Sequence, residues 1–474
     1  MKVFYQSSSC DIAVMNLKRL LILVLALSHL VCAQLPSGKS CFCKLSGSVD
    51  ECECSINSVD EFNNKKLFPI LKHLLERDFF RYYKVDMEKS CPFWKDEDRL
   101  CSATKDGPGD CGIKSCDEEV PPALKKSAEK NCPYEKDNCD NKDSGNTFDP
   151  FDSSIAEGMK AQFPVWAAFD ELENKFCDMD DNGSSKNMHY VDLLKNPERY
   201  TGYVGKSAQQ VWKCIYQENC FKPHPKFDKN FLLHPTITGL CLEKRVFFRL
   251  ISGLHTSITV SIAAHNYQPP QSAFDTGKWV RNLDMFKARF SPETTWGEGP
   301  QRLRNMYFLY LLELRALHKV APYLSQEFFY TGNDKEDAET RQIVSELMTT
   351  IGNFPDHFDE TTMFQGIEAT ARELKEEFRL HFLNISRIMD CVGCDKCRLW
   401  GKLQVHGIGT ALKILFSGMP HKKWATIPAQ ETPSLPPFQL TRNEVIALFN
   451  SFGRFATNIR EVAEFRRLLD DQNF

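Results

Sequence analysis

The chain has 474 residues, and its 59 Lys and Arg nearly balance 63 Asp and Glu, for a formal net charge of −4. This balance, without a block of basic residues, argues against a nucleic acid partner. The 19 cysteines are too few for a small disulfide-packed domain and too many for an ordinary cytosolic enzyme. Length and composition therefore favour a large globular protein from an oxidising compartment.

The N-terminus has the pattern of a secretion signal. Lys18 and Arg19 precede a long apolar run, and the small residues around Ala33 suit a signal peptidase. We expect cleavage after Ala33, which makes residues 1–33 the signal peptide. An uncleaved anchor is the alternative, although the apolar core is shorter than the ~20 residues of a membrane span. Two glycosylation sequons fit a lumenal chain, and they begin at Asn182 and Asn384.

The cysteines and the polar segments divide the mature chain. We expect residues 34–474 to form a single domain, with a Cys-rich segment at 34–116, a mobile polar loop at 117–160 and a helical core at 161–474. A Pro-rich loop at 417–439 separates the last two helical segments. Closely spaced cysteines near the N-terminus predict a small stapled hairpin, with the pairs Cys41–Cys54 and Cys43–Cys52.

The remainder predicts a mainly α fold. Apolar residues recur with helical period over 302–323, 361–382 and 403–416. Thr441 followed by Glu444 forms a capping box that opens a last helix over 442–471. The segment 258–262 alternates like a strand, or it continues a helix that starts after Cys241. A Rossmann fingerprint is absent, because the glycines at Gly407 and Gly409 lack the third glycine and follow a helix.

Cys391, Cys394 and Cys397 carry the strongest chemical signal. In an oxidising compartment, two cysteines two residues apart favour a reversible disulfide, and the third favours a structural tether. At helical spacing Cys394 and Cys397 lie one turn apart and can meet. The basic side chains of Lys396 and Arg398 favour a thiolate, which makes this pair exchangeable.

Other interpretations of this motif are a purely structural disulfide and a metal site. A ferredoxin-type cluster needs a Cys-Pro where Gly401 stands. Zinc needs a fourth ligand, and His406 is nearby, but structural zinc usually involves a matched ligand pair and a reducing compartment. We therefore favour redox chemistry at Cys394 and Cys397, without a metal.

A redox dithiol in this compartment needs an electron acceptor stronger than protein disulfide isomerase, which sits at about −180 mV. Flavin with oxygen is the plausible organic answer. A helical flavin site needs Arg or His contacts to the pyrophosphate and aromatic contacts to the rings. Composition alone does not select such residues, and the candidates are Arg199, Thr201, Trp212, Ser252, His255, Arg289 and Arg302.

A longer match identifies a family. The run from Cys391 to Lys402, Cys-Val-Gly-Cys-Asp-Lys-Cys-Arg-Leu-Trp-Gly-Lys, resembles the signature of the endoplasmic reticulum oxidoreductins, which are flavin-dependent thiol oxidases that recharge protein disulfide isomerase. Residues 1–33, 117–189 and 417–439 carry little of the resemblance. Further matching segments cover most of the chain, and they begin at Arg81, Cys91, Tyr190, Asn196, Leu250, Gly297 and Asn384.

The resemblance implies a role for each of these residues. FAD lies in a helical bundle, where the seven candidates named above occupy the cofactor-contact positions. Cys394 and Cys397 form the inner active-site disulfide, with Cys397 the sulfur nearer the flavin. The implied structural disulfides are Cys91–Cys391 and Cys220–Cys241.

The outer, shuttle disulfide departs from the family pattern. Nine residues separate Cys101 from Cys111 where the family has four. We favour Cys101–Cys111 as the shuttle pair, whereas Cys111 and Cys116 have the four-residue spacing of a pair that is regulatory in the family. The remaining cysteines are the regulatory candidates Cys132 and Cys139, and the candidates for free thiols Cys177 and Cys214.

The resemblance implies an FAD-dependent thiol oxidase that makes disulfides, passes them to protein disulfide isomerase and reduces oxygen to hydrogen peroxide. We expect a monomer in the endoplasmic reticulum lumen, with peripheral association with the membrane face left open. The alternative is a non-enzymatic, disulfide-rich lumenal binding protein or chaperone.

Overall fold

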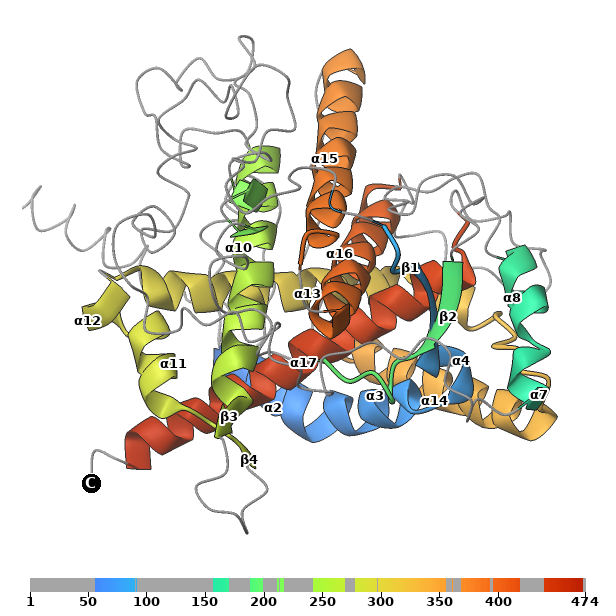
Figure 1. Ribbon diagram of the computed structural model, residues 1–474, viewed down its shortest axis with the longest axis horizontal. Helices are drawn as coiled ribbons and strands as arrows, with labels where there is room; N and C mark the ends of the chain where they lie inside the picture. Colours follow the sequence, from blue (N-terminus) through green and yellow to red (C-terminus); the bar gives the residue numbers. More distant parts are fainter. Residues whose placement is uncertain are drawn as a thin grey trace, which may run out of the picture.

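The protein is mainly α-helical in the computed structural model, as the sequence predicts (Figure 1). The structure describes residues 56–89, 91, 157–169, 188–198, 211–212, 214–216, 242–268, 278–295, 297–354, 360, 368–392, 395–417 and 439–471. In these residues the strands form two small two-stranded antiparallel sheets, and no Rossmann-like parallel sheet is present.

Five long helices build the core. They are α10 (Leu242–Ala264), α13 (Glu298–Leu324), α15 (Glu368–Met389), α16 (Asp395–Phe416) and α17 (Arg442–Asp471). Figure 1 shows α10, α15 and α16 standing upright, with α13 and α17 crossing them. α10 packs on α13 and α17, and α16 packs on α13, α15 and α17. The functional residues described below, which lie on α10 and α16, are therefore parts of one packed core.

α10 lies inside this core. Its stretch Arg245–Ala264 is long and apolar enough to cross a membrane, but most of it is buried inside the protein. Such burial is typical of a core helix in a globular protein. The segment 258–262 belongs to α10, so its helical interpretation is confirmed and the strand interpretation is wrong.

The capping box at the start of α17 is confirmed. The Thr441 hydroxyl accepts a hydrogen bond from the Glu444 backbone N–H at 3.0 Å, and the Glu444 carboxylate accepts one from the Thr441 N–H at 2.8 Å. Lys413 of α16 donates to the same carboxylate at 2.8 and 2.9 Å. This buried group thus joins the start of α17 to the last turn of α16.

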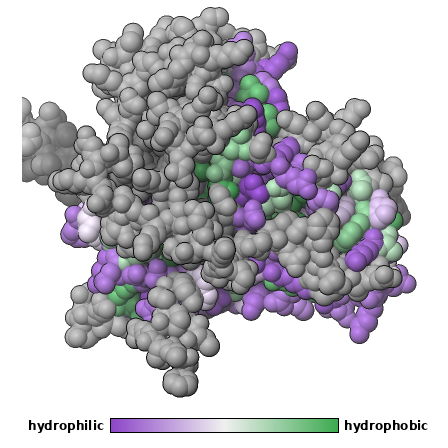
Figure 2. Space-filling model, viewed as in Figure 1, coloured by the Kyte–Doolittle hydropathy of each residue, from purple (hydrophilic) through white to green (hydrophobic). Residues whose placement is uncertain are grey.

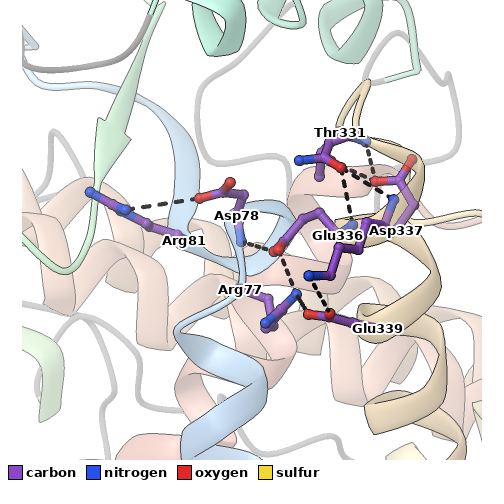
Figure 3. Close-up of polar contacts among 9 residues, drawn as sticks. Arg77, Asp78, Arg81, Thr331, Glu336, Asp337 and Glu339 are labelled. Carbon is purple, nitrogen blue, oxygen red and sulfur yellow. Dashed lines mark hydrogen bonds and ion pairs between the residues drawn. The ribbon is translucent and has the colours of Figure 1, made fainter.

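The N-terminal helices cover one side of α17. They are α2 (Ile56–Phe62), the π-helix η2 (Asn63–Leu67), α3 (Phe68–Leu75) and α4 (Asp78–Arg81). An ionic cluster fastens them to α14 (Asp334–Gly352), as Figure 3 shows. The Arg77 guanidinium contacts Glu336 and Glu339 at 2.5 and 2.6 Å, and the Asp78 N–H donates to Glu336 at 3.0 Å.

Short strands and helices complete the described fold. β1 (Tyr82–Asp86) pairs with β2 (Met188–Asp192), and β3 (Asn266–Gln268) pairs with β4 (Lys278–Val280). α11 (Leu283–Phe290) and α12 (Pro292–Thr295) precede α13. α7 (Glu157–Lys160) is helical, so the predicted mobile loop at 117–160 is wrong over its last residues. The rest of that loop lies outside the described residues.

α8 (Phe163–Phe169) is held by an aromatic cage around Arg442. The guanidinium lies over the ring of Trp166 at 3.7 Å and over Phe79 at 4.8 Å. On the face shown in Figure 2, apolar residues appear as patches over α8 and in the middle of the view, between polar stretches. Val165 of α8 is one of the exposed apolar side chains.

Candidate active site

Cys397 lies in the first turn of α16, is fully buried and is disulfide-bonded. Its predicted partner, Cys394, lies outside the described residues. The positive end of the helix dipole faces this first turn, and it stabilises a thiolate at Cys397 when the disulfide opens. The fold therefore adds a second source of thiolate stabilisation to the basic neighbours seen in the sequence.

A disulfide anchors the chain just before this helix. Cys91 and Cys391 are joined with an S–S distance of 2.06 Å across a sequence separation of 300 residues. This is the structural pair that the resemblance implied. Arg398 strengthens the same junction, because its guanidinium donates to the Met87 carbonyl at 2.8 Å and to Asp395 at 3.0 Å.

A buried ion pair lies one turn further along α16. The Lys402 ammonium contacts the Asp390 carboxylate at 2.7 Å and the Asp86 carbonyl at 3.2 Å. Only 2% of the Lys402 side chain and 5% of that of Asp390 are exposed. The pair joins α16 to the end of α15 and to the end of β1, so three separate parts of the chain meet at the base of the cysteine motif.

The segment that follows β2 is also bound to α16. The Trp400 indole N–H donates to the Asn196 carbonyl at 2.8 Å. Arg454 of α17 forms a buried ion pair with Glu198 and donates to the Gln404 side chain. The next residue in the chain is Arg199, which lies outside the described residues, as does Thr201.

A second cluster surrounds His255 on α10. The Trp212 ring stacks on the imidazole with centroids 4.0 Å apart and an interplanar angle of 15°. The Tyr216 hydroxyl lies 3.2 Å from the imidazole Nδ1. Burial, together with the positive charges of Arg289 and Arg302, lowers the pKa of His255 to about 3. The imidazole is therefore neutral at physiological pH, and two guanidinium groups lie close enough to affect it.

Ser252 lies one turn before His255 on α10. Its hydroxyl accepts a hydrogen bond from the Asn305 amide at 3.0 Å, and Asn305 in turn accepts from Arg249 at 3.2 Å. A hydroxyl has one proton to donate, so Ser252 can still donate toward a ligand. Gly253 permits this contact, since a Cβ there would lie 2.6 Å from the Asn305 carbonyl oxygen.

The two clusters are connected through the core. Gln404 on α16 donates to the Ser257 hydroxyl on α10 at 3.2 Å. Gln404 is two helical turns after Cys397, about 10 Å along the axis. Ser257 follows His255 by two residues. The cysteine-bearing turn and the His255 cluster thus belong to neighbouring parts of a single scaffold.

The His255 cluster fits a dinucleotide such as FAD. Arg289 and Arg302 both lie close enough to His255 to act on its charge, and Arg302 pairs with the half-exposed Glu298, so the two guanidiniums could bind an anionic group beside the imidazole. A stacked Trp–His pair presents flat surfaces, which suit an aromatic ring system. Phosphates and flat rings occur together in a flavin dinucleotide, and these residues could hold both parts.

Several predicted residues lie outside the described part of the chain, so their roles remain predictions. Asn384 is described and lies in α15, partly buried. The residues that lie outside are Cys41, Cys43, Cys52, Cys54, Cys101, Cys111, Cys116, Cys132, Cys139, Cys177, Asn182, Arg199, Thr201, Cys220, Cys241 and Cys394.

The structure corrects one expectation about the cysteines. Cys214 was a candidate for a free thiol, but it is disulfide-bonded. It sits between Trp212 and Tyr216 in a short helical segment, with 1% of its surface exposed. Because it is bonded and has little access to solvent, Cys214 is not a free surface thiol.

The fold and the site define a class: a mainly helical protein with a buried, disulfide-bonded cysteine at the start of one core helix and an aromatic, cationic cluster on another. Residues 66–462 match the model of the family Endoplasmic Reticulum Oxidoreductin 1 (ERO1). "Endoplasmic reticulum oxidoreductin-1" of Caenorhabditis elegans is 55% identical over an alignment of 447 residues, which covers 91% of this chain and 90% of the relative. "ERO1-like protein alpha" of Mus musculus is 46% identical, over 92% of this chain and 93% of the relative.

Similar solved structures support the same family assignment. A structure of Ero1p, described as the source of disulfide bonds for oxidative protein folding in the cell, has a TM-score of 0.56 and 31% identity, and covers 88% of this chain and 99% of that one. A double cysteine mutant of S. cerevisiae Ero1p gives a TM-score of 0.55 with the same coverage. The chain therefore belongs to the endoplasmic reticulum oxidoreductin family, and it is an oxidoreductase.

Proposed function

We propose that this protein is an FAD-dependent thiol oxidase that makes disulfides in the lumen of the endoplasmic reticulum. The observation that carries the proposal is the pairing of a buried, disulfide-bonded Cys397 with the His255 cluster in one scaffold. Family membership supports it, because the related Ero1p is described as a source of disulfide bonds for oxidative protein folding.

Each residue of the site has its own role in the proposed function. Arg289 and Arg302 supply positive charge for the phosphates, Trp212 supplies a flat face, and the Ser252 hydroxyl supplies a donor. When bound, the flavin supplies a two-electron acceptor between a dithiol and oxygen. The α16 start holds Cys397 in a water-excluded position and stabilises the thiolate that forms when this cysteine exchanges with its predicted partner, Cys394.

The full reaction balances with two electrons. A dithiol donor loses two electrons and two protons and becomes a disulfide, and oxygen accepts both to become hydrogen peroxide. We propose protein disulfide isomerase as the donor, which exchanges first with the outer pair Cys101–Cys111 and through it with Cys394–Cys397. This order keeps the buried Cys397 away from large substrates, since only the outer pair has to meet a partner protein.

The visible absorption spectrum of the purified mature chain tests the proposal. A flavin spectrum that bleaches on anaerobic addition of a dithiol, and returns with air as one equivalent of peroxide forms, is the expected result. A Cys397→Ala variant should retain the spectrum and fail to bleach. Folded but colourless wild-type protein would contradict the proposal and favour a disulfide-rich binding protein instead.

A further inference from the structure

The hydrogen bond between Tyr216 and His255 constrains what the imidazole can do. The Tyr216 hydroxyl occupies Nδ1 at 3.2 Å, and the Trp212 ring covers one face of the imidazole. No described residue bonds the remaining nitrogen, Nε2, which leaves this edge of the ring for a ligand. A neutral imidazole carries one N–H, so only one of its two nitrogens can donate.

The charges around His255 indicate the kind of ligand that it meets, and therefore which imidazole nitrogen has to carry the proton. Burial, together with the positive charges of Arg289 and Arg302, lowers the pKa of this side chain to about 3, so the imidazole that meets the ligand is neutral at neutral pH. Phosphate oxygens, and the carbonyl oxygens of flavin and ribityl groups, accept hydrogen bonds. A ligand that matches the two guanidiniums therefore needs a donor at Nε2, which leaves Nδ1 as an acceptor.

From this we infer that Tyr216 is a positioning residue: its hydroxyl donates to Nδ1 of His255 and so keeps the imidazole proton on Nε2, directed to the cofactor. The inference rests on the proposed function, because it assumes that the cluster holds FAD. Tyr216 is itself buried and tilted against Trp212 at 6.3 Å, so one side chain supports both the stacking ring and the tautomer.

Release of FAD from the purified holoprotein tests the role of Tyr216. Tyr216→Phe removes the hydroxyl and keeps the ring, so FAD fluorescence after dilution should show release about tenfold faster than in wild type, as expected for one lost hydrogen bond of about 1.4 kcal/mol. The chain offers a matched control. The Tyr83 hydroxyl lies 2.9 Å from Nδ1 of His406, outside the cluster, and Tyr83→Phe should leave release unchanged.

Testing Tyr216→Phe in a His255→Gln protein shows whether Tyr216 acts through the imidazole tautomer or only through packing. In His255→Gln, an amide N–H stands near the place of Nε2 and has no tautomer, so adding Tyr216→Phe should change the release rate by less than about twofold. If Tyr216 acted only through packing, the hydroxyl would matter equally in both backgrounds. The ¹⁵N spectrum of His-labelled holoprotein, assigned with His255→Gln, should show a protonated Nε2 in wild type.

The outcomes are distinct. A protonated Nδ1, or Tyr216→Phe and Tyr83→Phe that release FAD at the wild-type rate, would overturn the role of Tyr216 and leave the proposed function intact. Wild-type protein that carries no FAD when purified would overturn both.

Discussion

The start of α16 and the His255 cluster are held together by different forces. The first is fixed by strong ties between distant parts of the chain, namely the Cys91–Cys391 disulfide and the buried Lys402–Asp390 ion pair. The second is aligned by neutral hydrogen bonds and a stacked ring pair, all made by side chains of the pocket.

This difference matches what each region has to do under the proposed function. Thiol exchange breaks and remakes a covalent bond at Cys397, so the surrounding backbone has to stay in place without that bond. The covalent and ionic ties at its base meet this need. A pocket for a bound cofactor instead needs donors aimed in fixed directions, which weak but directional hydrogen bonds supply.

The largest effect should come from removing the sulfur chemistry while leaving the pocket intact. Cys397→Ala should abolish dithiol-driven oxygen consumption and leave FAD bound, because under the proposed function this cysteine passes electrons, whereas the residues of the His255 cluster hold the cofactor. Oxygen uptake and the visible spectrum check both halves of this expectation. Cys394→Ala is the matching variant, and Cys101→Ala should spare oxidation of small thiols but block that of the isomerase. A Cys397→Ala protein that still turned over dithiols would remove the pair from the mechanism.

The next largest effect should come from the ionic tie at the base of α16. Lys402→Met leaves the buried Asp390 carboxylate without its partner and should lower the free energy of unfolding by about 3–5 kcal/mol. Urea unfolding measures the loss. Lys402→Met combined with Asp390→Leu should recover most of it, since neither charge of the pair is then left buried without the other.

An exposed pair gives the control for this measurement. Lys65 and Glu61 are 2.9 Å apart, with side chains 71% and 64% exposed. Lys65→Met should therefore cost less than about 0.5 kcal/mol. If Lys65→Met and Lys402→Met lowered the free energy of unfolding equally, burial of the Lys402–Asp390 pair would not be the cause of the larger expected effect.

A smaller effect should follow from separating α10 and α13 beneath the pocket. The Cβ of Gly253→Ala would lie 2.6 Å from the Asn305 carbonyl oxygen, so the helices must move apart at a cost of about 1–3 kcal/mol. The Ser252–Asn305 bond should weaken with this shift, and FAD release should become faster. Gly352→Ala is the control, because nothing lies within 4 Å of its added Cβ. A stable Gly253→Ala protein with unchanged release would show that this close approach does not shape the pocket.

The sequence predicted those parts of the fold that depend on local rules. The Thr441–Glu444 capping box involves neighbours three residues apart, so the start of α17 was predicted at the right residue. α16 begins earlier than the predicted 403–416, because its first turn carries Asp395, Lys396 and Cys397, which give no apolar period. α15 runs on to Met389 rather than ending at 382, since Ile385 and Ile388 continue its buried face.

The site could be predicted only in part. His255 and Ser252 came from the family resemblance, and no spacing rule selects them. Tyr216 and Asn305 were missed, because each meets its partner only through tertiary packing, across 39 residues for Tyr216–His255 and 53 for Asn305–Ser252. Arg454, which meets Glu198 across 256 residues, was missed for the same reason.

The smallest expected effect is the contribution of His255 to the change of the free energy of unfolding with pH. The pKa of His255 is about 3 in the folded protein and about 6.5 in the unfolded chain. Below pH 6.5 the unfolded state binds a proton that the folded state does not, so this group lowers the free energy of unfolding as the pH falls from 6.5 toward 3. Between pH 7.5 and 5.5 the loss should be about 1.4 kcal/mol. His255→Gln should remove that part of the slope, whereas His406→Gln, whose imidazole is paired with Tyr83 outside the pocket, should retain it. Urea unfolding at the two pH values measures the difference, and an unchanged slope in His255→Gln would mean that the imidazole is not held neutral by the pocket.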